Sequence, residues 1–396
     1  MRLATLRRWR GMTQAQLAGL SGVTTSYISM LENGRRLLDR RSHISSLAAA
    51  LEVSETDLVG GPHLTPDAEQ ARPHTVIPPL ETALTTNRLH DAVVVEARPL
   101  GELARLVRET TTLQRQANYI ALVDSLPNLL DELHFHVSHG REHEQRQALD
   151  LLIETCSTAT MTAKHLGYPQ LAHIAATRAV EAAHVLDTPV YRARADYLRI
   201  QTLTHGRHGW ERNLHVASQT ADRLQELRRG DAMSLCPLGM VTLTAGLAAA
   251  SALREQEAYN WLEEAEALAR HVPNSPKSNW GSFSMENVRI WRVAIQVELQ
   301  TPPKQVRSSA YEVDIDRFWN SRIAALHADV GRALARDPST GDDAVPWLSQ
   351  AERYAPQAIR NNARVHEAVS VLTERARRNA SGRALRGMAA RMGVPH

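Results

Sequence analysis

The side chains most suited to contacting another molecule stand in one short stretch, "VTTSYISMLENGRR", residues 23–36. Two apolar residues in it, Ile28 and Leu31, have helical spacing and mark the inward face of a short helix. The opposite face then carries three small hydroxyls and a thioether, from Thr25, Ser26, Ser29 and Met30. Hydroxyls bond donors or acceptors on any base edge, and a methionine can pack against a thymine methyl group, so this face suits nucleic acid without indicating a base preference.

Positive charge follows this helix directly. The pair Asn33-Gly34 is typical of a helix end, and Arg35 and Arg36 come next. Residues 1–60 contain eight arginines and five acidic residues, a net charge of +3 that equals the net charge of the whole chain. All the excess positive charge therefore belongs to the segment that holds the hydroxyl face, as a nucleic-acid-binding module requires.

Short helices must position this face. The pattern predicts a first helix ending at Gly11, a second capped by Thr13 and a third capped by Thr24. Gly22, in the link "SGV", supplies the permissive backbone of a tight turn between the second and third helices. Two short helices joined by a three-residue turn predict a helix-turn-helix, whose second helix enters the major groove of DNA.

The segments "RRWRGMTQAQLAGLSGVTTSYISMLENGRR" and "HISSLAAALEVSETDLVG" resemble the XRE-type (lambda-repressor-like) family over five expected helices in residues 1–60. The resemblance implies phosphate contacts from Gln14, Asn33, Arg35, Arg36 and Arg40. It implies base contacts from the exposed positions of the third helix, with Tyr27 near the DNA backbone and Thr24 at the start of that helix: Thr25, Ser26, Ser29 and Met30. It also implies an ion pair between Arg7 and Glu32.

The rest of the chain is predicted to be all-α. Residues 61–79 are rich in proline and glycine and read as a linker, and residues 80–396 read as successive helices. One pattern recurs at intervals of 86 residues, in Ala172/Ala176/Ala179, Ala258/Leu262/Ala265 and Ala344/Leu348/Ala351. It resembles the second helix of a tetratricopeptide (TPR) repeat, which implies a TPR-like α-helical solenoid for effector binding and dimerisation.

The joint architecture resembles the XRE-TPR regulators of actinobacteria and, more remotely, the Gram-positive receptors that sense peptide pheromones. This resemblance implies a cytoplasmic homodimer that binds double-stranded operator DNA and senses a peptide or small-molecule effector. The alternative is a constitutive DNA-binding regulator whose TPR-like domain is a docking scaffold for other proteins. The family segment "F-G-P-x-N-V" is altered here to "FSMENV", residues 283–288.

Aromatic residues late in the chain are the candidates for an effector pocket. The predicted ligand-binding residues are Trp280, Phe283, Asn287, Trp291 and Trp319. On a helix over about 283–299, Asn287 lies one turn after Phe283 and one turn before Trp291, so two rings would flank one amide. An amide offers two donors and an acceptor for a polar ligand. The alternative is that the rings are core and Asn287 bonds a neighbouring helix.

Other function classes find little support. We find no Walker loop, dinucleotide fingerprint or nucleophile elbow, so the sequence predicts no enzyme, no catalytic residue and no cofactor. The histidines in "HFHVSHGREH" could bind a metal on one helix face, but Gly140 interrupts that helix, and a metal site is not predicted. The apolar stretch 240–253 is short for a bilayer, so no membrane contact is predicted.

Overall fold

The computed structural model describes residues 2–59, 71–203, 209–379 and 382–394. Within these ranges the regular structure is helical, and the single β-type contact is an isolated bridge between Arg88 and Asp91. The all-helical fold class predicted from the sequence is therefore confirmed.

The N-terminal helices form a small unit with a core of its own. Its helices are α1 (Arg2–Trp9), α2 (Gln14–Ser21), α3 (Thr25–Glu32), α4 (Arg41–Ala50) and α5 (Glu55–Val59). The side chains of Leu17, Ile28 and Leu47 are fully enclosed in this core. The predicted caps are present, since the hydroxyl of Thr13 accepts the backbone N–H of Gln16 and that of Thr24 accepts the N–H of Tyr27.

Regular structure resumes inside the predicted linker. The 3₁₀-helix η1 (Arg72–Val76) and helix α7 (Ile77–Thr86) occupy much of residues 72–79. Prolines stand in the first turns of both elements, where the missing N–H costs no hydrogen bond, so they begin these helices instead of preventing them. Val76 is fully buried in the C-terminal core. The linker predicted for residues 61–79 is thus too long at its C-terminal end.

The C-terminal domain continues as a succession of helices. They are α8 (Leu100–Arg115), α9 (Leu126–His139), α10 (Glu142–His165), α11 (Pro169–Leu186), α12 (Pro189–Gln201), α13 (Gly209–Arg223), α14 (Ala232–Ser251), α15 (Glu255–Ala269), α16 (Met285–Glu298), α17 (Pro303–Tyr311), α18 (Asn320–Arg336), α19 (Gly341–Tyr354), α20 (Pro356–Arg360), α21 (Ala363–Asn379) and α22 (Arg383–Arg391). Short 3₁₀ turns connect several of them, at η2 (Ile120–Leu122), η3 (Gln225–Arg229), η4 (Trp280–Ser282), η5 (Ile315–Arg317) and η6 (Pro338–Thr340).

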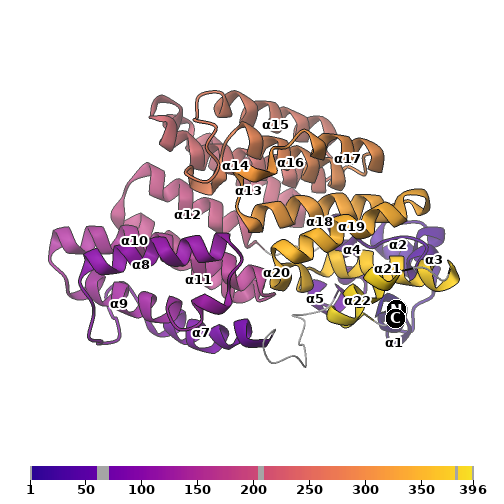
Figure 1. Cartoon of the computed structure of the whole chain (residues 1–396), viewed down its shortest axis with the longest axis horizontal. Coiled ribbons are helices and arrows are strands. Elements are labelled where there is room, and N and C mark those ends of the chain that lie inside the picture. The colour runs from indigo at the N-terminus through magenta and orange to yellow at the C-terminus, as the bar shows by residue number, and fades with distance from the viewer. Residues whose placement is uncertain (1, 60–70, 204–208, 380–381, 395–396) are drawn as a thin grey trace.

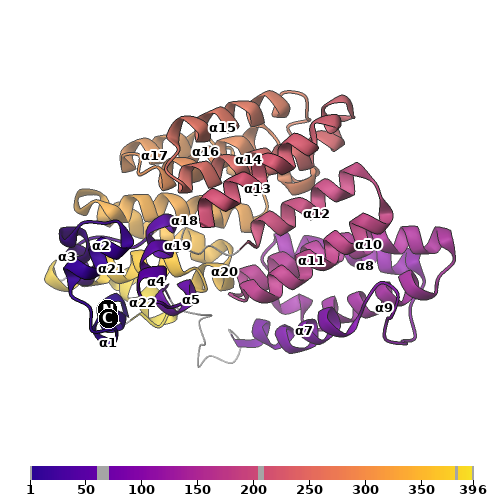
Figure 2. The same cartoon turned by 180° about the vertical axis from the view of Figure 1, so that it is seen from behind.

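These helices follow a curved path (Figures 1 and 2). Helices α7 to α12 form one side of the molecule, α13 to α17 lie at the top, and α18 to α22 return along the other side. The N-terminal unit lies beside α18 to α22, so the two ends of the sequence are neighbours in space.

The 86-residue pattern marks three extensively packed helix pairs, α10 with α11, α14 with α15 and α18 with α19. All nine residues of the pattern lie on the second helix of a pair and are buried. Glycine on the first helix permits close approach: a Cβ on Gly331 would lie 2.6 Å from Cδ2 of Leu348. The repeated small residues therefore lie at the contacts between the paired helices.

Helix α14 differs from the sequence prediction. It spans Ala232–Ser251, and its 20 residues are long and apolar enough to cross a membrane, whereas the apolar stretch alone was predicted to be too short. In the fold this helix packs against α12, α13, α15 and α16, and 78% of its apolar window is buried. Its apolar character is explained by this central position in the core.

Candidate DNA-binding site and its contact with the C-terminal domain

The end of α3 delivers two arginines to the surface. Gly34 has a left-handed backbone, φ 65°, and the N–H of Gly34 donates to the carbonyl of Leu31 at 3.2 Å. The N–H of Arg35 donates to the carbonyl of Met30 at 2.8 Å, so the last turn of α3 is closed by a Schellman pair of bonds. The chain then turns away from the helix axis, and the side chains of Arg35 and Arg36 are exposed.

The outward face of α3 is accessible. Thr24, Thr25 and Ser26 are exposed, and Ser29 and Met30 are partly exposed. Asn33, also exposed, donates from its amide to the hydroxyl of Ser29 at 3.4 Å. The candidate base-contacting residues therefore share one open surface that adjoins the two exposed arginines.

A partly buried ion pair holds α3 against α1. The guanidinium of Arg7 donates to both carboxylate oxygens of Glu32, from Nε at 2.6 Å and Nη2 at 2.9 Å, which confirms the predicted pair. The amide of Gln14 donates to the same carboxylate at 2.8 Å. Hydrogen bonding from Arg7 is the main cause of the lowered pKa of Glu32. The family resemblance implies that Gln14 contacts a DNA phosphate. In the structure its amide nitrogen bonds Glu32, and this bond fixes α2 to the end of α3.

Tyr27 and Arg40 have inward roles in this structure. The hydroxyl of Tyr27 lies 2.9 Å from Nδ1 of His43 on α4, and burial raises the pKa of Tyr27 to about 12. Burial lowers the pKa of His43 to about 4, with a further contribution from Arg40. Arg40 is partly buried, its Nε has no hydrogen-bond partner among the described residues, and burial lowers its pKa. We therefore infer that the side chains of Tyr27 and Arg40 help to hold α3 in position. The family-based prediction that they contact DNA remains a prediction.

Residues 37–41, which we call the docking segment, join the end of α3 to the C-terminal domain. Leu37 is part of the large C-terminal core, whereas the next residue, Leu38, belongs to the N-terminal core. The N–H of Leu38 donates to the carboxyl of Glu367 on α21 at 3.2 Å. Two adjacent leucines thus point into two different domains.

Charged side chains reinforce the docking segment. Arg336 on α18 donates from Nε to the carboxylate of Asp39 at 2.7 Å, and Arg332 donates from Nη2 to the Asp39 carbonyl at 3.0 Å. Arg41 donates from Nε to Glu298 on α16 at 3.1 Å. The Asp39, Arg332 and Glu298 side chains are at most 4% exposed, so the ion pairs are shielded from water.

The ion pairs around the docking segment involve more cationic than anionic side chains. Glu298 is shared by Arg41 and Arg364, which donates to it at 2.9 Å. Burial would raise the pKa of Glu298, but the surrounding arginines outweigh it and lower the pKa to about 2. Nε of Arg332 and Nη1 of Arg336 are buried without a hydrogen-bond partner among the described residues. The interface between the domains therefore contains more cationic donors than its carboxylates satisfy.

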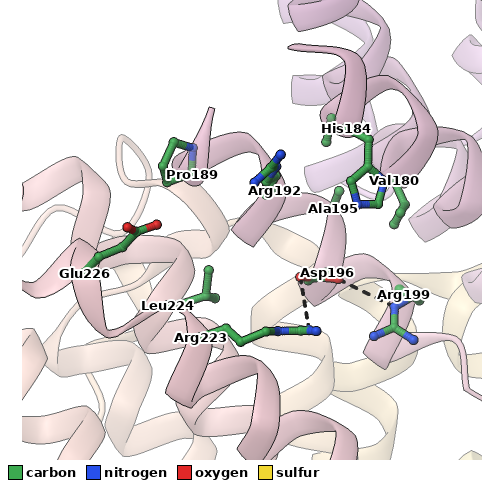
Figure 3. Close-up of a pocket in the computed structure, with 11 residues that line it drawn as sticks. Val180, His184, Pro189, Arg192, Ala195, Asp196, Arg199, Arg223, Leu224 and Glu226 are labelled. Atoms are coloured by element: carbon green, nitrogen blue, oxygen red, sulfur yellow. Dashed lines mark ion pairs between the residues drawn. The ribbon is translucent and has the colours of Figure 1, made fainter. Parts of the chain in front are cut away.

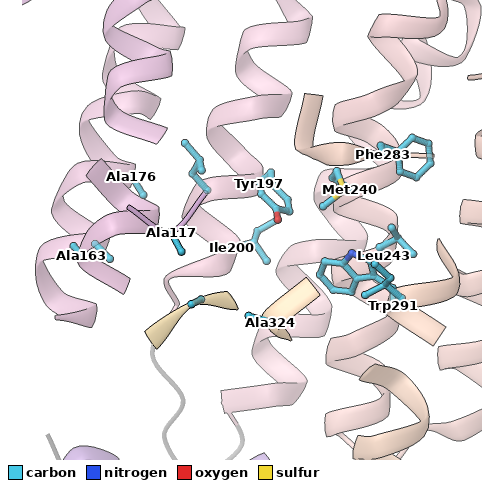
Figure 4. Close-up of a cluster of buried hydrophobic side chains, with 14 of the residues drawn as sticks. Ala117, Ala163, Ala176, Tyr197, Ile200, Met240, Leu243, Phe283, Trp291 and Ala324 are labelled. Atoms are coloured by element: carbon cyan, nitrogen blue, oxygen red, sulfur yellow. The ribbon is translucent and has the colours of Figure 1, made fainter. Parts of the chain in front are cut away.

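The predicted effector residues other than Trp319 are buried. Phe283 and Trp291 lie in one apolar cluster with Met240 (Figure 4), and Trp280 belongs to the same cluster. Helix α16 begins at Met285, capped by Ser284, so Phe283 precedes the helix and does not start it as predicted.

Asn287 is fully buried and donates from its amide to the carbonyl of Gly281 at 3.2 Å. Trp319 is partly exposed, with the ammonium of Lys277 5.7 Å from its ring centroid. The positions of Trp280, Phe283, Asn287 and Trp291, but not that of Trp319, match the alternative in which the aromatic residues are core.

The histidines of α9 bond to the backbone. His134 Nδ1 lies 2.7 Å from the carbonyl of Leu130, and His136 Nε2 lies 2.7 Å from that of Arg98. Nε2 of His134 is buried without a hydrogen-bond partner among the described residues.

Two cavities adjoin the middle of the C-terminal domain. One, of about 410 Å³, lies between α11, α12 and η3, where Asp196 pairs with Arg199 and Arg223 at 3.6 and 3.7 Å (Figure 3). The other, of about 490 Å³, lies between α4 and helices α10 to α14, and its wall includes Arg41 and Lys164. The second cavity is formed by both domains, so its occupant would touch the unit that carries α3.

Comparison with known proteins supports the N-terminal assignment. Residues 1–59 match a family model described as a helix-turn-helix domain. No curated protein and no solved structure matches the chain. The match identifies α1 to α5 as a helix-turn-helix unit, which implies DNA binding.

Proposed function

We propose that this helix-turn-helix protein is a sequence-specific transcriptional regulator of the XRE type that binds operator DNA as a homodimer. Its C-terminal helices form a TPR-like superhelix that senses a peptide or small-molecule effector. It acts in the cytoplasm and catalyses no reaction. The alternative is a constitutive DNA-binding regulator whose C-terminal domain is a docking scaffold. In that case the contacts between the domains would transmit no signal to the DNA-binding unit.

The observation that carries this proposal is the position of the docking segment. It begins two residues after Arg35, whose carbonyl accepts a hydrogen bond from Arg375 on α21 at 3.2 Å. Asp39 and Arg41 then pair with α18 and α16. A rearrangement of those helices would change how α3 is held, while its DNA-facing side chains stay open.

Dimerisation follows from the size of the DNA-binding surface. One short recognition helix buries too little surface for tight, specific binding. Two copies on half-sites about one helical turn apart, ~34–36 Å, would double the contacts. The C-terminal domain then sets the spacing of the two α3 helices, because the docking segment fixes α3 to it.

Arg35→Ala is expected to weaken binding to all DNA sequences and to lower the slope of log affinity against log salt by about 1, because one phosphate contact is lost. Ser29→Ala is expected to change the preference among operators with little change in that slope. Fluorescence anisotropy over a salt series measures both quantities. Arg105→Ala is the matched control, since this exposed arginine lies on α8, away from the N-terminal unit. A change of sequence preference in Arg35→Ala, with intact non-specific affinity, would contradict this placement of α3.

A further inference from the structure

The cavity of about 490 Å³ between the domains, which we call the interdomain cavity, has a wall of both charged and apolar side chains. From the N-terminal unit it is lined by Arg41, Ala48 and Glu55, and from the C-terminal domain by Lys164, Trp210 and Leu247, among others. Its volume is within the range of ~300–1,000 Å³ that is typical of small-molecule sites.

Lys164 is a cation in the cavity wall whose hydrogen-bond acceptors among the described residues are neutral. Its ammonium donates to the backbone carbonyl and the side-chain oxygen of Gln201, at 3.1 and 2.9 Å, and both acceptors are neutral. Among the described residues no carboxylate lies within ion-pair distance of it. Lys164 is exposed in the cavity wall, and the loss of solvation around its ammonium, together with the charges of Arg41, Arg364 and Arg322, lowers its pKa. The charged form of Lys164 therefore lacks compensation at this wall.

Arg41 adds to the positive charge at the same end. Its guanidinium lies 5.2 Å from the centroid of the Trp210 ring, and its carboxylate partner, Glu298, is shared with Arg364. Among the described residues the one carboxylate in the wall is Glu55, which accepts a hydrogen bond from Ser45, and burial raises its pKa. The balance of charge at the cavity therefore favours an anion.

A second polar group in the wall lacks a partner. Asn213 is buried, and its side-chain oxygen has no hydrogen-bond partner among the described residues. A buried acceptor without a donor costs free energy, on the order of 1–3 kcal/mol. A ligand with a hydroxyl or an N–H group would satisfy it.

We propose that the interdomain cavity binds a small organic acid. The acidic group pairs with the ammonium of Lys164, close to Arg41, and the apolar body packs against Trp210, Leu247 and Ala48. The assignment rests on the proposed function, because it identifies the effector class and its site. A bound acid supplies the missing negative charge between a residue of α10 and a residue of α4, so it strengthens the contact between the C-terminal domain and the DNA-binding unit.

The test uses the full chain and two probe compounds, 2-naphthoate and its neutral analogue 2-naphthamide, in isothermal titration calorimetry at pH 7. We expect the acid to bind at least tenfold more tightly than the amide, and Lys164→Gln to remove this difference. Lys304→Gln, the same change at an exposed lysine outside the cavity, is the matched control and is expected to keep it. Equal affinities for acid and amide, no binding of the acid, or unchanged selectivity in Lys164→Gln would overturn the proposal. Inorganic phosphate that binds as tightly as the acid would overturn the apolar part of the assignment.

A second measurement does not depend on a folded variant. Reductive methylation of the wild-type chain at pH 7, followed by mass spectrometry, compares Lys164 with the other two lysines, Lys277 and Lys304. We expect Lys164 to react fastest, because its lowered pKa leaves part of it uncharged at pH 7, and we expect 2-naphthoate to slow it selectively. Methylation of Lys164 that saturating acid leaves unchanged would place the acid elsewhere.

The proposed function is tested separately, by binding of the wild-type chain to operator DNA without acid. DNA binding without acid binding would refute only the cavity assignment. Acid binding without DNA binding would refute the regulator and leave the cavity a binding site.

Discussion

Replacement of Arg332 by alanine is expected to lower the free energy of unfolding by about 3–5 kcal/mol, the usual cost of removing one partner from a buried ion pair. The Arg332 side chain is 1% exposed and donates to Asp329 at 2.7 Å as well as to the Asp39 carbonyl. Its loss leaves Asp329 and Glu298 with less positive charge around them. Urea denaturation of the full chain measures the change. Arg317→Ala, at an arginine 48% exposed and paired with Asp314, is the control and is expected to cost about 1 kcal/mol or less.

The same variant should loosen the domain contact. Hydrogen exchange of the Leu38 amide, which donates to Glu367, is expected to be faster in Arg332→Ala than in the wild-type chain, because the neighbouring Asp39 loses a donor. Unchanged exchange at Leu38, together with a stability loss below 1 kcal/mol, would show that the ion pairs do not hold the docking segment.

Glu32→Gln is expected to destabilise the chain by about 2–4 kcal/mol at pH 7, because it leaves the Arg7 guanidinium, 12% exposed, without a charged partner. It should also weaken binding to every DNA sequence, since α3 loses its bond to α1. Thermal unfolding and fluorescence anisotropy measure the two effects. Glu52→Gln, at an exposed position of the same unit, is the matched control.

The effect of Glu32→Gln should depend on pH in a definite direction. The folded-state pKa of Glu32 is below its ordinary value, so its stabilising contribution is complete above about pH 4.5. It is lost as the pH falls through the folded-state pKa. The difference between wild type and variant should therefore be constant near neutral pH and shrink in acid. A difference that grows as the pH falls would be inconsistent with the ion pair.

The helix-turn-helix was predictable because its signals are local. Thr13 and Thr24 cap helices within three residues of themselves, and the N–H groups of Gly34 and Arg35 close α3 by bonding to carbonyls three and five positions earlier. The predicted linker extended too far because of its prolines, since proline is common both in loops and in the first turn of a helix. Those near residue 78 begin α7.

The contact between the domains depends on residues far apart in sequence. Asp39 and Arg336 are 297 positions apart, and no local pattern connects them. Two signals were present: a pair of leucines separated by four residues from the end of α3, and two arginines one turn apart among the apolar residues of α18. Helical spacing correctly put Asn287 and Trp291 one turn apart, but it cannot distinguish a pocket wall from a core. In the fold these residues face α14, which is enclosed on several sides.

We propose that the full chain binds DNA as a dimer that its C-terminal domain holds together. In this dimer α3 contacts a specific DNA sequence. The direct test is selection of the purified full chain on a random DNA library, followed by footprinting of the enriched fragments. We expect one enriched motif with two protected half-sites whose centres are ~34–36 Å apart on one face of the duplex. No enriched sequence, or protection of a single unpaired half-site, would contradict it.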